Sequence, residues 1–307
     1  MCGIVGIVGN HAVAPRLVDA LKRLEYRGYD SAGVATVHEG RLERRRAEGK
    51  LVNLERKLAD EPLAGNSGIA HTRWATHGAP TETNAHPHFV DGVSVVHNGI
   101  IENFGEIKQE LAATGATFQT QTDTEVVAQL LARYIRDGKT PRAAVEDMLA
   151  RVTGAYALAI LFEQEPGKIY AARSGPPLAI GYGNGEMFLG SDAIALAPFT
   201  NQIAYLTDGD WAVITSTSAE IYDATGTPVK RQRQQSSASA FLIDKGNHRH
   251  FMEKEIHEQP EAISHTLGHY IDFAESRIKP VAGIDFASIS SLAISACGNR
   301  LSRRPDG

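Results

Sequence analysis

The sequence predicts a layered α+β domain, because many short apolar runs typical of strands alternate with fewer segments of helical periodicity. Strand-like runs begin at Gly33, Ser67 and Val93, and a later series reads AYALAILF, KIYAAR, AIGYG, EMFLGS, AVITS and AEIYDA. The chain of 307 residues is long enough for one large domain and a second, smaller or incomplete one.

The first predicted element is a strand that leads into a helix. Gly3–Gly9 alternates small and β-branched residues, as buried strands do, and the apolar residues that follow have helical spacing: Val13, Leu17, Leu21 and Leu24. Further helices are expected over 51–58, around 107–111 and from Thr122 to Ile135.

Two helix starts carry capping sequences. Thr122 and Glu125 have the spacing of a capping box, in which each side chain accepts a backbone N–H at the helix start. Thr140 followed by Pro141 combines an N-cap with a first-turn proline.

A change in composition after Ile221 marks the best candidate for a linker. VKRQRQQSSASAF is polar, charged and rich in serine, and helical patterning returns from Phe251 to Leu267. SLAISACG from Ser291 has the pattern of a buried strand that opens a new domain, and NRLSRRPDG follows it. We therefore predict a first domain at 2–230, a linker at 231–250 and the truncated start of a second domain at 251–307.

Charge and composition argue against several classes of protein. The net charge of −5 disfavours nucleic acid or an anionic membrane as the main partner, and the arginines at 44–46 are expected on a solvated strand edge. Two cysteines, Cys2 and Cys297, are too few for a disulfide framework and indicate a reducing, cytoplasmic compartment. No segment has the pattern of a signal peptide or membrane span. Since GYGNG at 181–185 lacks the spacing of a dinucleotide fingerprint, no cofactor is predicted.

Cys2 is the first candidate for catalysis. Removal of Met1 would leave a free α-amine on the residue that carries the thiol. An α-amine has a pKa of about 7.7–8.0 and a thiol one of about 8.5, so the amine can accept the thiol proton near neutral pH. The alternative is a small buried apolar residue, which is the commoner role of a free cysteine.

Three motifs add polar groups, each with a structural alternative. In HTRWATHG at 71–78, Arg73 suits bidentate capture of a carboxylate or a structural ion pair. In HNG at 97–99, the Asn98 amide and the Gly99 N–H can form an oxyanion hole or an ordinary turn. In TQTDTE, Asp123 can hold an ammonium group or cap a helix.

The clustered histidines could suggest a metal site, but their spacing does not support one. Five of the 12 histidines fall within a short stretch: His71, His77, His86, His88 and His97. The chain has no HExxH motif and no paired CxxC, and NAHPH on a short strand spreads or buries its histidines. We therefore predict no metal.

Taken in order, MCGIVGIVG, LEYRGYDSAG, HTRWATHG, NAHPH, HNGIIEN and TDTE resemble the class II glutamine amidotransferases, which have an N-terminal nucleophile. HTRWATHG and the FMEKEIHEQPEAI segment at 251–263 favour the branch that aminates fructose 6-phosphate to glucosamine 6-phosphate. The resemblance implies a four-layer αββα sandwich of the N-terminal nucleophile hydrolases, followed by a linker and an incomplete α/β sugar isomerase domain.

The resemblance also implies a role for each site residue. Cys2 would attack the glutamine amide while its own amine acts as base, and Asn98 and Gly99 would stabilise the oxyanion. Arg73 would hold the substrate carboxylate and Asp123 its ammonium, with Thr76 and His77 lining the same pocket. Arg27, Tyr29 and Trp74 match positions near the nucleophile or on a loop that closes over glutamine.

The resemblance further implies L-glutamine as substrate, fructose 6-phosphate as acceptor only in a full-length enzyme, and a homodimer at full length. The chain departs from the family after Gly298, where a sugar-phosphate loop is expected. We therefore expect glutamine hydrolysis alone. Two alternatives stay open: an N-terminal cysteine amidohydrolase with a different amide substrate, and a catalytically silent regulatory or binding fragment of the same fold.

Overall fold

The computed structural model describes residues 2–25, 28–75, 77–236, 251–272 and 277–278. These belong to two compact units, Met1–Asp244 and Lys245–Gly307. The predicted strand at Ser291, Cys297 and the C-terminal arginines lie outside the described residues.

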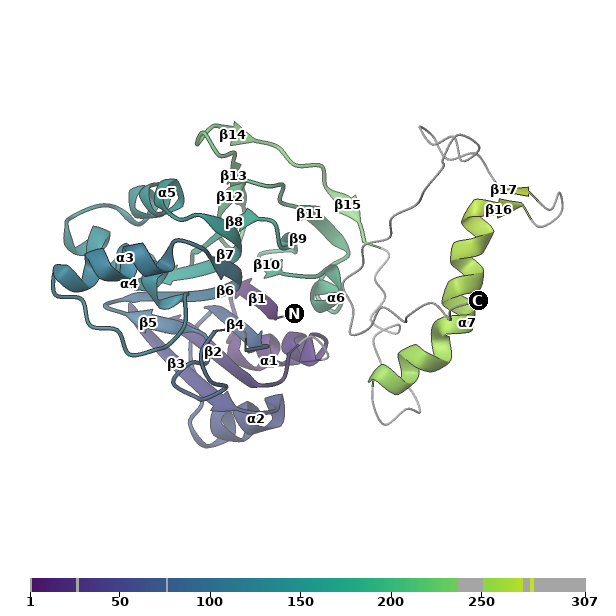
Figure 1. Cartoon of the computed structure of the whole chain (residues 1–307), viewed down its shortest axis with the longest axis horizontal. Helices are drawn as coiled ribbons and strands as arrows, with labels where there is room; N and C mark the ends of the chain where they lie inside the picture. The colour runs from purple at the N-terminus through teal and green to yellow at the C-terminus, as the bar shows by residue number, and fades with distance from the viewer. Residues whose placement is uncertain (1, 26–27, 76, 237–250, 273–276, 279–307) are drawn as a thin grey trace, which may run out of the picture. The chain divides into compact units, whose positions relative to one another are not determined.

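The first unit contains two antiparallel sheets (Figure 1). The eight-stranded sheet has the order β15-β11-β9-β10-β1-β4-β2-β3, formed by Gln234–Gln235, Gln202–Tyr205, Ala179–Tyr182, Met187–Gly190, Gly3–Val8, Ser67–Arg73, Ser31–His38 and Arg41–Glu48. The seven-stranded sheet has the order β14-β13-β12-β8-β7-β6-β5, formed by Pro228–Val229, Ala219–Tyr222, Trp211–Ile214, Ile169–Ser174, Gly154–Phe162, Val93–Ile101 and His88–Val90.

Helices cover the outer face of each sheet (Figure 1). The eight-stranded sheet packs against α1 (Ala14–Lys22), α2 (Leu51–Asp60) and α6 (Ala193–Leu196). The seven-stranded sheet packs against α3 (Phe104–Ala113), α4 (Glu125–Arg136) and α5 (Pro141–Arg151). The α+β class is confirmed, and the helix and sheet layers have the order αββα.

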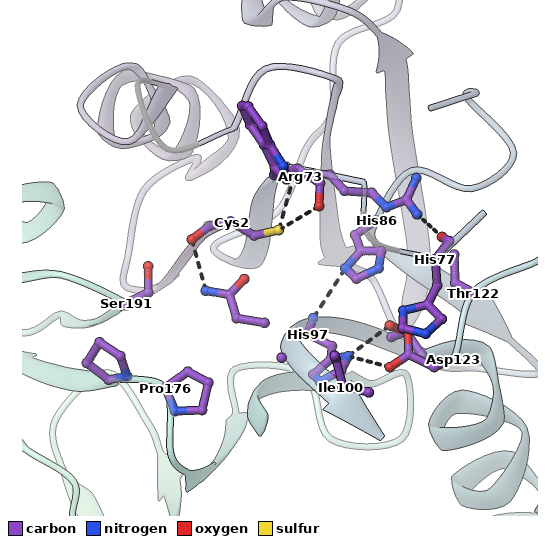
Figure 2. A pocket seen from close by; sticks show the side chains of 15 residues that line it. Cys2, Arg73, His77, His86, His97, Ile100, Thr122, Asp123, Pro176 and Ser191 are labelled. Atoms are coloured by element: carbon purple, nitrogen blue, oxygen red, sulfur yellow. Dashed lines mark hydrogen bonds and ion pairs between the residues drawn. The ribbon is translucent and has the colours of Figure 1, made fainter. Parts of the chain in front are cut away.

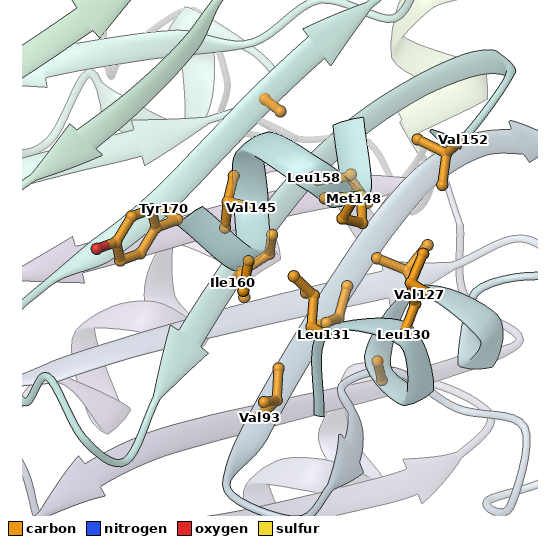
Figure 3. Packing of buried hydrophobic residues seen from close by; sticks show 14 of the residues in the cluster. Val93, Val127, Leu130, Leu131, Val145, Met148, Val152, Leu158, Ile160 and Tyr170 are labelled. Carbon is orange, nitrogen blue, oxygen red and sulfur yellow. The ribbon is translucent and has the colours of Figure 1, made fainter. Parts of the chain in front are cut away.

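Three apolar clusters correspond to the three interfaces between these layers. Figure 3 shows the cluster under α4 and α5, where Val127, Leu131 and Met148 meet Leu158 and Ile160 of β7. The central cluster lies between the sheets and includes Ile4, Ile69, Ala159 and Ile180. Strands β1 and β7 are buried along most of their length because they have a neighbouring layer on both faces.

The two predicted capping sequences have different outcomes. Thr140 accepts a hydrogen bond from the Ala143 N–H at 3.3 Å, and Pro141 occupies the first turn, as predicted. The capping box at Thr122 is wrong. The helix begins at Glu125, whose carboxylate accepts the N–H groups of Gln119 and Thr120 outside the helix.

The arginines at 44–46 bind neighbouring backbone rather than only forming a solvated edge. Arg46 donates to the carbonyl oxygens of Thr83 and Ala85 at 2.9 and 2.8 Å, and Arg44 donates to that of Pro87 at 3.0 Å. These bonds attach the NAHPH segment to β3. Burial lowers the pKa of Arg46 to about 10.

The contacts of the first unit continue past residue 230, where the sequence predicts a linker. Arg231 forms a bidentate ion pair with buried Asp210, at 2.7 and 2.6 Å, and Gln234–Gln235 pairs with β11 as an edge strand. In the second unit, α7 (Phe251–Tyr270) matches the predicted helical patterning, and β16 (Ile271–Asp272) pairs with β17 (Arg277–Ile278). No helix among the residues described could span a membrane.

Candidate active site

A cavity of about 440 Å³ opens where β1 and β4 of one sheet meet β6 of the other. The pairing of β1 with β4 places Gly3 opposite Thr72, so Cys2 lies beside Arg73 and Trp74. The cavity is lined by Cys2, Arg73, Trp74, His77, His86, His97, Asn98, Gly99, Ile100, Thr122, Asp123, Thr124, Pro176, Pro177 and Ser191 (Figure 2).

The Cys2 sulfur faces the end of β4. Its Sγ accepts a hydrogen bond from the Trp74 N–H at 3.1 Å. Burial raises the pKa of the Cys2 thiol, while the Trp74 N–H and the positive charge of Arg73 act in the opposite direction. The net shift favours the thiol, so formation of the nucleophile requires a base.

Asn98 and Gly99 lie together on β6, as the motif predicted. The Asn98 Nδ2 donates to the Cys2 carbonyl oxygen at 3.1 Å, which places the amide beside the nucleophile. Gly99 has a φ of +122°, and an added Cβ would overlap the carbonyl oxygen of Ala155 on β7. Position 99 therefore requires glycine, and its backbone can line the cavity at close range.

Arg73 is buried and bound by the loop that follows it. Its guanidinium donates to the carbonyl oxygens of His77, Ala79 and Gly78, the last two at 3.2 and 3.5 Å. Burial lowers its pKa, an effect opposed by nearby acidic groups that include Asp123. Arg73 thus stabilises the 77–79 loop while lining the cavity.

Asp123 is buried before α4 rather than capping it. Its Oδ2 accepts a hydrogen bond from the Ile101 N–H at 2.8 Å and lies 3.8 Å from His97 Nδ1. Together with Arg73 it gives the cavity groups of opposite charge. His77 also lines the cavity, and its ring packs edge-on against Phe104.

Tyr29 and Trp74 form an exposed aromatic pair next to Cys2. Their ring centroids are 5.6 Å apart in a T-shaped arrangement, and close to half of each side chain is exposed. Arg27 and Thr76, the two other predicted site residues, lie outside the described residues.

Two residues of the RGYDSAG motif that we did not single out position the strand end beside Cys2. Asp30 accepts the Ala75 N–H at 2.8 Å and donates its own N–H to the Arg73 carbonyl at 3.1 Å. A Cβ on Gly28 would collide with the backbone of Arg73 and Trp74. Their presence in the motif was the only sequence signal for this role.

A second missed group closes the cavity near the Cys2 backbone. Ser191 Oγ accepts the Ile4 N–H at 3.0 Å, and Ser191, Pro176 and Pro177 all line the cavity (Figure 2). Arg173 holds this proline segment by donating to the carbonyl oxygens of Gly175 and Pro176 at 3.1 and 3.2 Å. No local pattern connects these residues to Cys2.

Comparison with known proteins identifies the domain. A glutamine amidotransferase domain model matches residues 71–198. A glutamine--fructose-6-phosphate aminotransferase (isomerizing) of Rhizobium meliloti strain 1021 is 72% identical over 299 residues, which cover 97% of this chain and 49% of that protein. The enzyme of the same name from Agrobacterium fabrum strain C58 is 70% identical with the same coverage. The chain belongs to the class II glutamine amidotransferases.

The chain spans about half the length of the curated relatives that it matches. Its fold is also that of a solved glutamine phosphoribosylpyrophosphate amidotransferase from B. subtilis, with 25% identity and a TM-score of 0.64. That alignment covers 72% of this amidotransferase and 49% of the other chain.

Four buried histidines lie in or next to the cavity wall: His86 and His97 line the cavity, and His71 and His88 contact them from outside its lining. His71 stacks on His86 with centroids 4.3 Å apart, His86 contacts His88, and the His97 N–H donates to His86 Nδ1 at 3.3 Å. Burial lowers the pKa of all four, that of His71 to about 3. Within the described part of the chain, no group of histidine, cysteine and acidic side chains could hold a metal ion.

Because burial lowers the pKa of these four histidines, we expect the domain to lose stability as the pH falls. A histidine has a pKa of about 6.5 in the unfolded chain, so between that pH and its lower folded value the unfolded state binds more protons. Each such histidine then reduces the free energy of unfolding by about 1.4 kcal/mol per pH unit. Their stabilisation is complete above about pH 6.5 and is lost progressively below it.

The measurement is urea unfolding at several values between about pH 7.5 and 5. We expect the slope of stability against pH to correspond to the uptake of several protons on unfolding, and His88→Gln to reduce it by about one proton. A stability that stays constant over this range would contradict the neutral, buried state of the cluster.

Proposed function

We propose that this chain hydrolyses L-glutamine to glutamate and ammonia through a thioester on Cys2. The observation that carries this proposal is the convergence of the Cys2 sulfur, the Asn98 amide and the oppositely charged Arg73 and Asp123 on one cavity. Membership of the class II glutamine amidotransferases also supports glutamine as the substrate.

In this mechanism the α-amine of Cys2, free after removal of Met1, takes the thiol proton. The thiolate attacks the side-chain carbonyl of glutamine, and the oxyanion is stabilised by Asn98 Nδ2 and the Gly99 N–H. The protonated amine then gives its proton to the departing amide nitrogen, and ammonia leaves. Water attacks the remaining thioester with the same amine as base, releasing glutamate and restoring the thiol.

The charges of the cavity suit a free amino acid. Arg73 can contribute a guanidinium to the α-carboxylate, and Asp123 can contribute a carboxylate to the α-ammonium. An amidohydrolase that acted on an uncharged amide would not need both groups. A profile of amides with and without each terminal charge separates these two activities.

A diazoketone analogue of glutamine tests the proposal. With Met1 removed, we expect intact mass spectrometry to show one adduct, located on Cys2 rather than Cys297 by peptide mapping and reduced by excess glutamine. Glutamate release from glutamine is measured on the same preparation. A protein that binds glutamine but forms neither adduct nor glutamate would be the silent binding module instead.

Asp123→Asn is expected to weaken glutamine binding more than folding. The substitution preserves an oxygen that can accept the Ile101 N–H but removes the charge that faces the substrate ammonium. We expect KM for glutamine to rise on the order of 30-fold, as for one buried charge partner worth about 2 kcal/mol, with a small change in kcat.

Steady-state kinetics and a thermal unfolding curve are needed for this variant. Asp210→Asn is the matched control, because Asp210 is also a buried carboxylate that accepts a backbone N–H, from Thr207 at 2.7 Å, but does not line the cavity. Equal KM values for wild type and Asp123→Asn would remove Asp123 from the substrate site.

Transfer of the ammonia to fructose 6-phosphate is proposed for a protein of the relatives' full length. There, an isomerase domain following a linker would bind the sugar phosphate, and the protein would form a homodimer in the cytoplasm. For a protein of these 307 residues, we expect glutamate production that is unchanged by fructose 6-phosphate, without glucosamine 6-phosphate. Separate assays of glutamate and amino-sugar phosphate check this, and amino-sugar formation would disprove it.

A further inference from the structure

We propose that His71 is a positioning residue, which donates a hydrogen bond from Nε2–H to Asn98 Oδ1 and so directs the Asn98 amide nitrogen toward the reacting carbonyl. The inference deepens the proposed function and rests on it for its catalytic consequence. His71 lies on β4, one residue before Thr72, and its place among the clustered histidines had suggested only a metal ligand.

The orientation of the Asn98 amide follows from its two contacts. The Cys2 carbonyl oxygen, 3.1 Å from one end of the amide, can only accept a hydrogen bond, so that end is the nitrogen. The other end is therefore Oδ1, which lies 2.9 Å from His71 Nε2. Because an amide oxygen also only accepts, Nε2 must carry the proton.

The surroundings of the His71 ring agree with a neutral imidazole protonated at Nε2. The ring is fully buried, and burial lowers its pKa to about 3, so it carries a single proton at neutral pH. The backbone of His97 lies near the ring and acts to raise its pKa, but this effect is smaller than that of burial. Nδ1 has no hydrogen-bond partner among the residues described. Nε2–H is thus the ring's hydrogen-bond donor.

Two fixed contacts prevent rotation of the Asn98 amide. One N–H is bound by Cys2 O and the oxygen is bound by His71, so the second N–H keeps one direction. A donor already oriented before the substrate arrives requires no rearrangement when the oxyanion forms. Loss of His71 should therefore lower kcat and leave glutamine binding by Arg73 and Asp123 nearly intact.

The tautomer can be measured without any enzymatic activity. Long-range proton–nitrogen NMR correlations on protein labelled with ¹⁵N-histidine distinguish Nε2–H, Nδ1–H and doubly protonated rings, and loss of one signal set in His71→Gln assigns His71. We expect the Nε2–H form at about pH 7.5. An Nδ1–H ring, which has no hydrogen on Nε2 to donate, would overturn the proposal, even if the protein proved inactive and the proposed function were wrong.

Steady-state kinetics test whether His71 contributes to catalysis through Asn98. We expect His71→Leu to lower kcat on the order of 10–100-fold with KM changed less than about threefold, whereas His71→Gln, whose amide N–H can replace Nε2–H, recovers most of the loss. In an Asn98→Ala background, His71→Leu should add little. His88→Leu is the control for burial, because it removes an equally buried imidazole that bonds to Thr122 instead.

Comparable losses of thermal stability in His71→Leu and His88→Leu, with a loss of kcat only in the first, would support the proposal. An unchanged kcat in His71→Leu, or an additive loss in the Asn98→Ala background, would refute it while leaving glutamine hydrolysis by Cys2 in place.

Discussion

A residue retained in front of Cys2 is expected to reduce glutamine hydrolysis by about 10³-fold, within the range of 10²–10⁴ that general acid–base catalysis contributes. Acylation turns the α-amine into an amide, which cannot accept the thiol proton or return it to the leaving group. The thiol itself remains, and burial raises its pKa, so little thiolate forms without the base.

Two cleavable fusions provide the comparison. One protease product begins with Cys2, and the other keeps a single glycine before it, so that the two proteins differ only at the N-terminus. Equal glutaminase rates would show that another group serves as base. Unfolding curves check that the added glycine leaves the fold intact.

The second large effect on glutamine hydrolysis is expected when the Asn98 amide is removed. Asn98→Ala should lower kcat by about 10²–10³-fold, as expected for one donor of an oxyanion hole, with a smaller change in KM. It also leaves the His71 N–H without its acceptor, which costs about 1–3 kcal/mol of stability. The assay therefore needs a temperature well below the unfolding midpoint of the variant.

Asn103→Ala is the matched control for this variant. Asn103 also bonds backbone groups through both ends of its amide, accepting from Thr153 N–H at 3.1 Å and donating to the Arg151 carbonyl at 2.8 Å, but it does not line the cavity. We expect reduced stability with nearly normal kcat. If Asn98→Ala resembled Asn103→Ala in kcat, the Asn98 amide would not stabilise the oxyanion.

Most secondary structure could be predicted from local pattern. The runs at Ser67 and Val93 became β4 and β6, and the Thr140–Pro141 start became the start of α5, because strand alternation and capping depend on residues close in sequence. Strand β11 was missed because its two buried residues, Ile203 and Ala204, are adjacent and show no alternation. The order of strands in the two sheets has no local signal.

The sequence by itself determined which chemical groups this protein has: a cysteine after the initiator methionine, an Asn98–Gly99 donor pair, and the charges of Arg73 and Asp123. Only the tertiary structure decided how they are held. Asp30 fixes the backbone beside Trp74, Ser191 fixes β1, and His71 binds Asn98 from a different sheet. The physical reason is that these hydrogen bonds join residues between 27 and 187 positions apart, and their geometry exists only once both sheets have packed together.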